Sequence, residues 1–161
     1  MLNGLDAFLF RLFELTRKAG IDVSPYPMDH VCYRVATMER YLELAHAWRL
    51  YARVSHESIV NGRPISVFLL GTPLEVAGRV ITCLELPAPK EGAPYPEGWE
   101  HAEFVIDEPF AHFMSRYDEH VFDTKGLTKE LNPELGYKLP EGLQIKFHHL
   151  PLERVIQIEE E

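Results

Sequence analysis

Three histidines and one glutamate are the residues of this sequence best placed to do chemistry. They are His30, Glu85, His101 and His148, and each lies in a short apolar or β-branched run that predicts a β-strand. Imidazole nitrogens and carboxylate oxygens are ligands that divalent transition metals accept. If folding brings the four together, they would bind zinc, nickel, manganese, cobalt or iron, and ligand type alone does not select among these metals.

Alternation within the four predicted strands places their polar side chains on one face of a sheet. Successive side chains of a strand point to opposite faces, and in each run the polar residues share one parity. This polar set is His30, Cys32, Arg34, Cys83, Glu85, His101, Glu103, Gln144, Lys146 and His148. The sequence therefore predicts a curved sheet with one buried face and a polar cup on the other, with His148 in the cup and His149 facing away.

Three further residues of the polar parity could act on a substrate in such a cup. Glu103 lies one strand step from His101, and we expect it to be a general base or an acceptor for an imidazole N–H; a solvated carboxylate on the rim is the alternative. Arg34 and Lys146 would bring positive charge near the metal and favour an anionic substrate. Either cation could instead neutralise Glu85 or Glu103.

The composition limits the function classes that remain. A chain of 161 residues corresponds to about one domain, and a hydrophobic content of 46% is sufficient for a core. The formal charge of −9 argues against nucleic-acid binding, because phosphate recognition needs a basic surface.

No apolar run approaches the roughly 20 residues that cross a bilayer. With two cysteines and no recognisable signal peptide, we expect a cytoplasmic protein with free thiols. The oligomeric state stays open.

The order of the predicted elements repeats along the chain. A helix at 6–18 and its lead-in to residue 27 precede a strand at 29–35, a helix at 37–52, and strands at 55–60, 63–70 and 74–86. After a linker rich in proline and glycine at 87–98 come a strand at 100–106, a helix at 108–121, weak extended signals at 128–139, a strand at 143–148 and a helix at 150–158. We therefore predict one α+β domain in which two βαβββ modules, 28–86 and 99–161, form a curved mixed sheet.

The turn between the strands at 55–60 and 63–70 is the strongest local signal in this pattern. Asn61-Gly62 separates the two runs, and a type I′ hairpin turn needs positive φ at both of its central residues. We expect a tight hairpin there.

The predicted strands resemble the metal-binding strands of the vicinal oxygen chelate superfamily, and of glyoxalase I enzymes in particular. The segments that carry the resemblance are HVCYRV at 30–35, LEL at 84–86 and EHA at 100–102. The fourth strand departs from the glyoxalase pattern, because Lys146 stands where those enzymes present a glutamate. His148 lies two residues further on the same face and is the candidate substitute ligand. The resemblance implies a glyoxalase-like fold with a metal cup, while the departure predicts that glyoxalase activity itself is absent.

A longer resemblance, from about Asp29 to Val155, is to the YecM-like bacterial proteins, a branch of the same superfamily described as predicted metalloenzymes. It is carried by DH at 29–30, NGRPI at 61–65, ELP at 85–87, GWEH at 98–101 with Glu103, and IKFH at 145–148. The chain looks shorter than that family in its second half. The resemblance implies a fold and a metal cup, and it brings no known substrate.

Taken together, we expect a metal-dependent lyase, isomerase or oxygenase that acts on a small oxygen-rich substrate. The metal would act as a Lewis acid on substrate oxygens, with Glu103 as the base. Two other classes stay open: a non-catalytic protein that binds a small ligand in the same cup, and a metal-free structural domain. A cup filled by its own side chains, with Glu85 paired to Lys146, would favour the last.

Overall fold

A computed structural model describes residues 2–92 and 95–161, which form a seven-stranded mixed sheet with four α-helices. The elements in chain order are α1 (Leu5–Lys18), β1 (Met28–Arg34), α2 (Met38–Arg49), β2 (Ala52–Val60), β3 (Arg63–Val76), β4 (Arg79–Pro87), β5 (Gly98–Val105), α3 (Phe110–Ser115), β6 (Glu134–Lys138), β7 (Gln144–His148) and α4 (Leu152–Glu160). Residues 93–94 of the predicted linker lie outside the described residues.

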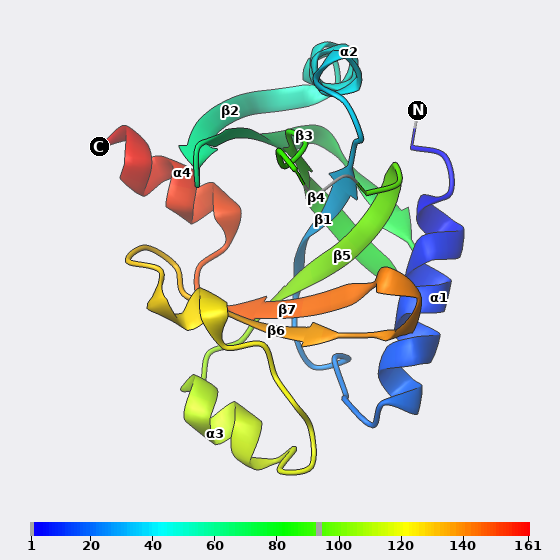
Figure 1. The fold of residues 1–161 in the computed structure, drawn as a ribbon, viewed down its shortest axis with the longest axis vertical. Coiled ribbons are helices and arrows are strands. Elements are labelled where there is room, and N and C mark those ends of the chain that lie inside the picture. Colours follow the sequence, from blue (N-terminus) through cyan, green and yellow to red (C-terminus); the bar gives the residue numbers. More distant parts are fainter. Residues whose placement is uncertain (1, 93–94) are drawn as a thin grey trace.

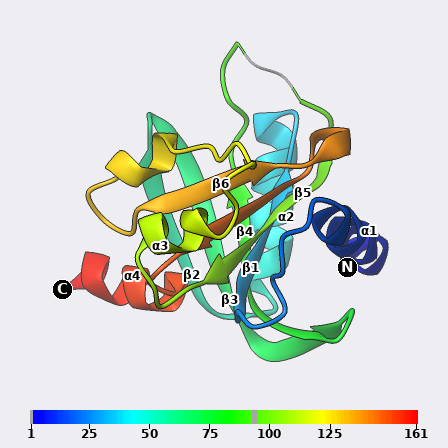
Figure 2. The same cartoon turned by 90° about the horizontal axis from the view of Figure 1, so that it is seen from below.

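The strands lie side by side in the order β2-β3-β4-β1-β5-β7-β6. The two central strands, β1 and β5, are antiparallel to each other, and each pairs in parallel with the closing strand of its own half, β4 or β7. The sheet curves without closing, and its hollow side faces α4 and the segment that leads into β6 (Figure 1). The helix α1 covers the opposite, convex side, and the view from below agrees (Figure 2).

The two halves of the sheet are related but unequal. The first half runs β1, α2, β2, β3, β4, which is the predicted βαβββ order. The second half runs β5, α3, β6, β7 and has one strand fewer among the described residues, so the prediction of a second βαβββ module is wrong. Residues 116–133 contain few β-branched side chains and include Gly126, Asn132 and Pro133, a composition that does not sustain a ladder. Only an isolated bridge from Asp123 to Gly136 remains there.

Two tight turns connect the strands of the first half. The Asn61-Gly62 hairpin is confirmed, since both residues have positive φ, 51° and 79°. The strand predicted at 74–86 is instead two strands, because the chain reverses at Ala77 and Gly78, which have φ of 51° and 74°. Alanine seldom adopts the left-handed conformation because its Cβ clashes with the backbone there, so residue preferences did not predict this turn.

The helices follow the predictions except in the second half. α1 and α2 lie where the apolar spacing placed them, and the Thr37 side chain caps α2 by accepting a hydrogen bond from the Arg40 backbone at 3.1 Å. The helix predicted at 108–121 is helical only over Phe110–Ser115. Pro109 directly precedes this helix, and among the described residues no side chain caps it.

The apolar parity of the strands builds the main core on the convex side, as predicted. Strand residues such as Val31, Leu84 and Phe104 pack there against α1, α2 and α3. A smaller apolar cluster on the hollow side joins Val67, Leu69 and Cys83 to Ile156 of α4. The helix α4 therefore packs on the first half of the sheet from the polar side.

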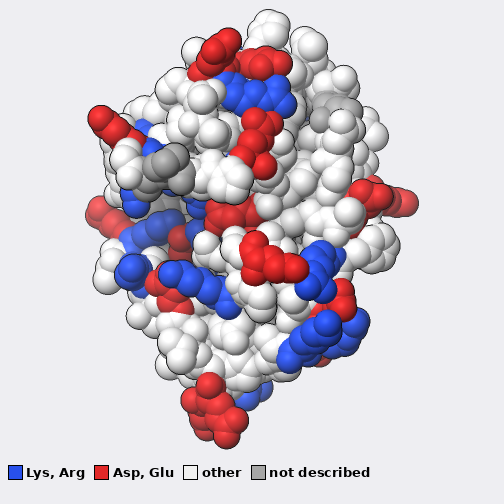
Figure 3. All heavy atoms as spheres, turned by 45° about the vertical axis from the view of Figure 1, so that its right-hand side comes forward, with Lys and Arg blue, Asp and Glu red and all other residues white. Residues whose placement is uncertain are grey.

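The surface carries charges of both signs. Acidic and basic side chains are interspersed on the face shown in Figure 3, although acidic residues are in excess over the whole chain. Within the described ranges, no helix combines the length and apolar character needed to cross a membrane.

Candidate metal centre

Two neighbouring rows of the sheet bring four potential ligands to its centre. Cys32 of β1 is the backbone partner of Glu85 on one side and of His101 on the other, so these three residues form one row. In the next row His30 of β1 is paired with Glu103 of β5. All of these side chains lie on the hollow face, which confirms the face predicted from strand parity. We call His30, Glu85, His101 and Glu103 the donor group.

The donor atoms are spaced as ligands of one ion would be. Nε2 of His101 lies 3.1 Å from Oε1 of Glu103 and 3.7 Å from Oε1 of Glu85. Nε2 of His30 lies 3.4 Å from Oε1 of Glu103 and 3.8 Å from Oε2 of Glu85. One ligand atom from each of the four residues falls within 4.8 Å of all the others. Ligands about 2.1 Å from a tetrahedral ion lie about 3.4 Å apart, so the spacing fits a zinc-sized cation.

Burial of these polar side chains costs free energy unless hydrogen bonds or a bound cation compensate for the lost contact with water. His30, His101 and Glu103 are 0%, 1% and 3% exposed. Nε2 of His30 has no hydrogen-bond partner within residues 2–92 and 95–161. A buried nitrogen without a partner costs free energy, and a bound cation would remove that cost. The residues present therefore fit a divalent metal.

The electrostatics of the donor group depend on mutual compensation of buried charges. Burial alone would lower the pKa of the His30 imidazole, but the Glu103 charge and the hydrogen bond to Asp29 outweigh it, so that pKa is raised well above 6.5. Burial would raise the pKa of Glu103, but His30 and His101 outweigh it, so that pKa is held well below its usual value. The two carboxylates, whose pKa values are both lowered, would balance the charge of a divalent cation once the two imidazoles are neutral.

His148 lies in the cup but belongs to a second group. Its Nε2 is 3.4 Å from Oδ2 of Asp29, and the residues brought together there are Asp29, His30 and His148. His148 is also buried, at 1% exposure. In the donor group the fourth position is filled by Glu103, where the sequence suggested His148. His149 faces away, as parity predicted, and its Nδ1–H donates to the carbonyl of Ile106 at 2.8 Å.

Glu103 was expected as a base outside the metal ligands, and the structure places it within the donor group. Its Oε1 faces His30 and His101, and its Oε2 lies 3.5 Å from Nδ1 of His148. Lys146 is the backbone partner of Glu103 on β7, and its Nζ lies 3.9 Å from Glu103 Oε1 and 3.3 Å from Glu134 Oε1. Among the described residues no ion pair joins Lys146 to Glu85.

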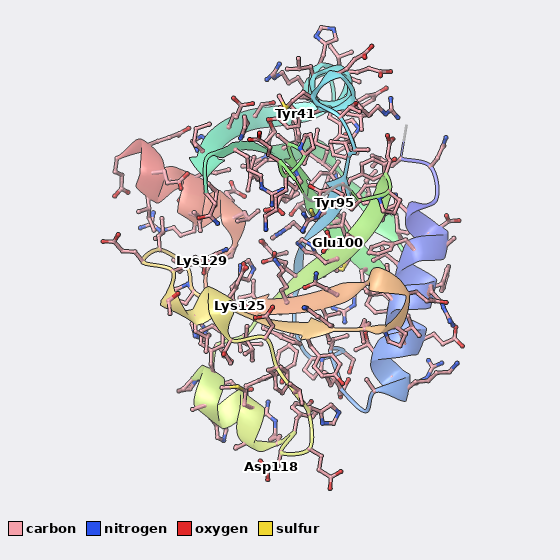
Figure 4. All side chains as sticks on the ribbon, viewed as in Figure 1. Tyr41, Tyr95, Glu100, Asp118, Lys125 and Lys129 are labelled. Carbon is pink, nitrogen blue, oxygen red and sulfur yellow. The ribbon has the colours of Figure 1, made fainter. Side chains whose placement is uncertain are left out.

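A cleft of about 320 Å³ lies over the donor group. Glu85, Glu103 and His148 line it from the sheet, and the 129–134 segment and α4 enclose it. Lys129, which begins that segment, lies on its side facing α4 (Figure 4). The apolar part of the lining consists of Val60, Ile65, Val67, Leu131, Leu152, Val155 and Ile156. A small ligand could therefore reach the donor group between polar and apolar walls.

Arg34 was predicted to bind substrate, and it lies outside this lining. It forms an ion pair with Glu100, and its guanidinium lies over the ring of Tyr95 at 5.0 Å. Glu100 and Tyr95 are both near the start of β5 (Figure 4). Arg34 therefore balances the charge of Glu100 at one end of the cup.

The sequence reasoning missed Asp29, Glu100 and Asn132, which contact the histidines of the cup. In regular strands, Asp29 and Glu100 would face the apolar side of the sheet, opposite to the histidines that follow them. Asn132 lies in an irregular segment. One signal was available for the two acids, because the acid–histidine dipeptide occurs twice, as Asp29-His30 and Glu100-His101.

Comparisons with known proteins agree with one another. Residues 1–139 match the family described as YecM protein. Protein YecM of Escherichia coli (strain K12) is 36% identical over 107 residues, which cover 65% of this chain and 55% of that protein. An uncharacterized protein of Haemophilus influenzae is 35% identical over 147 residues, covering 84% of this chain and 74% of that protein. A solved structure titled "Structural Genomics, Protein EC4020" covers 96% of this chain and 88% of its own, with a TM-score of 0.79 at 28% identity.

Proposed function

The chain belongs to the YecM family, and we propose that it is a metal-dependent enzyme of the vicinal oxygen chelate type acting on a small oxygen-containing substrate. The family name carries no activity, so the proposal comes from the site. The observation that carries it is the donor group, in which donor atoms of the buried His30, His101 and Glu103 and of the half-buried Glu85 have the mutual spacing of metal ligands. Such a group would hold zinc, nickel, manganese, cobalt or iron.

The ligand set would be His30, Glu85, His101 and Glu103. A divalent ion held there would supply a Lewis acid to the oxygen atoms of a substrate in the cleft. In the glyoxalase-like pattern the fourth strand provides a glutamate, and here that position is Lys146. Because Lys146 is the backbone partner of Glu103, the carboxylate is provided one strand away, and the lysine partly balances its charge. This different ligand arrangement is the reason we expect no glyoxalase turnover.

The cleft gives the donor group one accessible side. Glu85 is 17% exposed and lines the cleft together with Glu103, so a substrate would approach the ligands from there. The apolar side chains of α4 and β3 would hold the non-polar part of the substrate and exclude water. The chain's own contribution is therefore to orient the substrate between the sheet and α4.

A metal-free structural domain is a second candidate that one observation favours. His101 and Glu103 already lie within hydrogen-bond distance, at 3.1 Å, so part of the cup satisfies itself. The unpartnered Nε2 of His30 and the open cleft argue against this alternative. A non-catalytic binder would use the same cleft, and an absence of metal there would favour it.

Cobalt binding with an added chelating ligand distinguishes these candidates. We expect the wild type to bind one Co²⁺ per chain and its visible spectrum to shift when acetohydroxamate is added, because an ion held by these four ligands would expand its coordination to take a further ligand from the cleft. Glu103→Gln should lose the ion, whereas Glu130→Gln, a change in the cleft lining outside the donor group, should keep it. No cobalt binding would support the structural domain, and a spectrum insensitive to acetohydroxamate would indicate a closed structural site.

A separate assay distinguishes an enzyme from a binder. NMR of small hydroxycarbonyl and catechol compounds, incubated with the metal-loaded protein, should show conversion or exchange of a substrate proton. Binding to the wild type without any conversion across these compounds would favour the binder.

A further inference from the structure

The two ligand histidines are each preceded by a carboxylate, and the backbone aims both carboxylates into the cup. The dipeptides are Asp29-His30 on β1 and Glu100-His101 on β5. In a regular strand, adjacent side chains face opposite sides, so these acids should point to the apolar core. Their contacts with the histidines therefore need a local irregularity on each strand.

Two register shifts in the pairing of β1 with β5 provide these local irregularities. β1 advances two residues from Met28 to His30 while its partner moves one, which makes Asp29 the extra residue. At the other shift β5 advances two residues from Trp99 to His101 while β1 moves one, which makes Glu100 the extra residue. A β-bulge of this kind re-aims the side chain of the inserted residue. One bulge on each central strand thus places each acid beside its histidine.

The first acid contacts three groups with one oxygen. Nδ1–H of His30 donates to Oδ2 of Asp29 at 2.8 Å, and the backbone N–H of Leu152 donates to the same oxygen at 3.1 Å. Nε2 of His148 faces that oxygen at 3.4 Å. Leu152 begins α4, so Asp29 links the donor group to the helix that forms one wall of the cleft.

The backbone of Leu150 fixes which nitrogen of His148 carries a proton. Its N–H donates to Oδ1 of Asn132 at 3.0 Å, and its carbonyl accepts from Nδ2 of Asn132 at 2.9 Å, which sets the orientation of the amide. The same Nδ2 donates to Nδ1 of His148 at 3.0 Å. The proton of neutral His148 is therefore on Nε2, which lies 3.4 Å from Oδ2 of Asp29 and has no hydrogen-bond partner among the described residues. We therefore place His148 beside Asp29 and outside the donor group.

The second acid has a looser version of the same arrangement. Oε1 of Glu100 lies 3.4 Å from Nδ1 of His101 and accepts a hydrogen bond from Nε2 of Gln144 at 2.8 Å. Glu100 also forms the ion pair with Arg34. Both ligand histidines thus have a carboxylate on Nδ1 and present Nε2 to the donor group.

We propose that Asp29 and Glu100 are a matched pair of positioning residues, each holding Nδ1–H of its histidine so that Nε2 is bare for the metal. This inference rests on the proposed metal site. A carboxylate on the outer nitrogen of a ligand histidine fixes its tautomer and ring orientation, and its loss costs about 10- to 100-fold in metal affinity. Asp29 makes the shorter contact and also holds α4, so its removal should have the larger effect.

Imidazole nitrogen NMR of the zinc-loaded wild type tests the assignment without any substitution. We expect His30 and His101 to carry a proton on Nδ1 and zinc on Nε2, and His148 to be free of zinc with its proton on Nε2. Zinc on Nδ1 of either ligand histidine, or on His148, would overturn the inference. If the protein bound no zinc, the proposed function would fail, and the Nδ1 protonation of neutral His30 and His101 in the metal-free protein at alkaline pH would decide the inference separately.

Zinc affinity of conservative variants, measured by competition with a chromophoric chelator, gives the second test. Asp29→Asn should weaken zinc binding by about 10- to 100-fold and Glu100→Gln by a smaller factor. The matched controls are Asp22→Asn and Glu97→Gln, carboxylates outside the cup that should leave zinc affinity unchanged. Variants that bind zinc as tightly as their controls would overturn the positioning role while leaving the metal site intact.

Discussion

His30 and Glu103 are direct partners across the β1–β5 pair, and Nε2 of His30 lies 3.4 Å from Oε1 of Glu103. The two residues come from the opening strands of the two halves of the sheet. Side chains of direct cross-strand partners share a face and lie close together, so this pairing joins the histidine of one half to the carboxylate of the other. The donor group is complete only when both halves are folded together.

Removal of the positive charge beside Glu103 should strengthen metal binding. Lys146→Gln takes away a cation 3.9 Å from a ligand oxygen, and we expect zinc affinity to rise by roughly tenfold, a small part of the Coulomb energy at such a separation. Lys129→Gln is the matched control, because Lys129 pairs with Glu134. Competition with a chromophoric chelator measures both affinities. Weaker zinc binding by Lys146→Gln would show that the lysine helps to hold the site together.

Metal binding should stabilise the fold. At a zinc concentration 100 times the dissociation constant, the free energy of unfolding should increase by about 2.7 kcal/mol. For a chain of this size that corresponds to a rise in melting temperature of roughly 5–10 °C, measurable by differential scanning calorimetry. Glu85→Gln should remove most of this rise and stay folded. Identical melting curves with and without zinc, nickel, cobalt and manganese would argue against a metal site.

The stabilisation by metal should grow as pH rises. His30 has a pKa above 6.5 in the folded protein, because the Glu103 charge and Asp29 outweigh the effect of burial. Its contribution to the stability of the metal-free protein is complete below pH 6.5 and is lost as pH rises through the folded pKa. Metal binding needs the neutral imidazole, so it becomes more favourable over the same range. We expect a larger zinc-induced melting shift at pH 8 than at pH 6; an equal or smaller shift at pH 8 would contradict this assignment.

The hairpin turn between β2 and β3 should depend on its glycine. Gly62 has φ of 79°, and a Cβ in that conformation costs roughly 1–2 kcal/mol, so Gly62→Ala should lower the free energy of unfolding by about that amount. Gly71→Ala is the control, since Gly71 lies outside the left-handed region and its added Cβ would meet only the Tyr51 carbonyl at 3.5 Å. Urea denaturation measures both. Equal stability losses would show that backbone conformation is not what Gly62 provides.

Local signals were sufficient for much of the fold. Strand parity predicted that His30, Glu85 and His101 share the hollow face, because alternation depends only on neighbouring residues in a regular strand. The Asn61-Gly62 turn was predictable for a similar reason, since both residues tolerate positive φ. The reversal at Ala77 was not, because alanine seldom adopts that conformation.

The exact membership of the site could not be read from the sequence. The register between β1 and β5 decides that Glu103, and not His148, lies opposite His30, and register depends on contacts between distant segments. The bulges that aim Asp29 and Glu100 into the cup break the parity rule on which the prediction relied. The missing strand of the second half reflects weak propensities over residues 116–133.

Native mass spectrometry of chelator-treated protein titrated with zinc tests the central claim most directly. The donor group predicts one zinc per chain in the wild type, loss of that ion in Glu85→Gln and in Glu103→Gln, and its retention in His148→Gln. A wild type that takes up no stoichiometric zinc, or a His148→Gln variant that loses the ion while Glu103→Gln keeps it, would contradict the account.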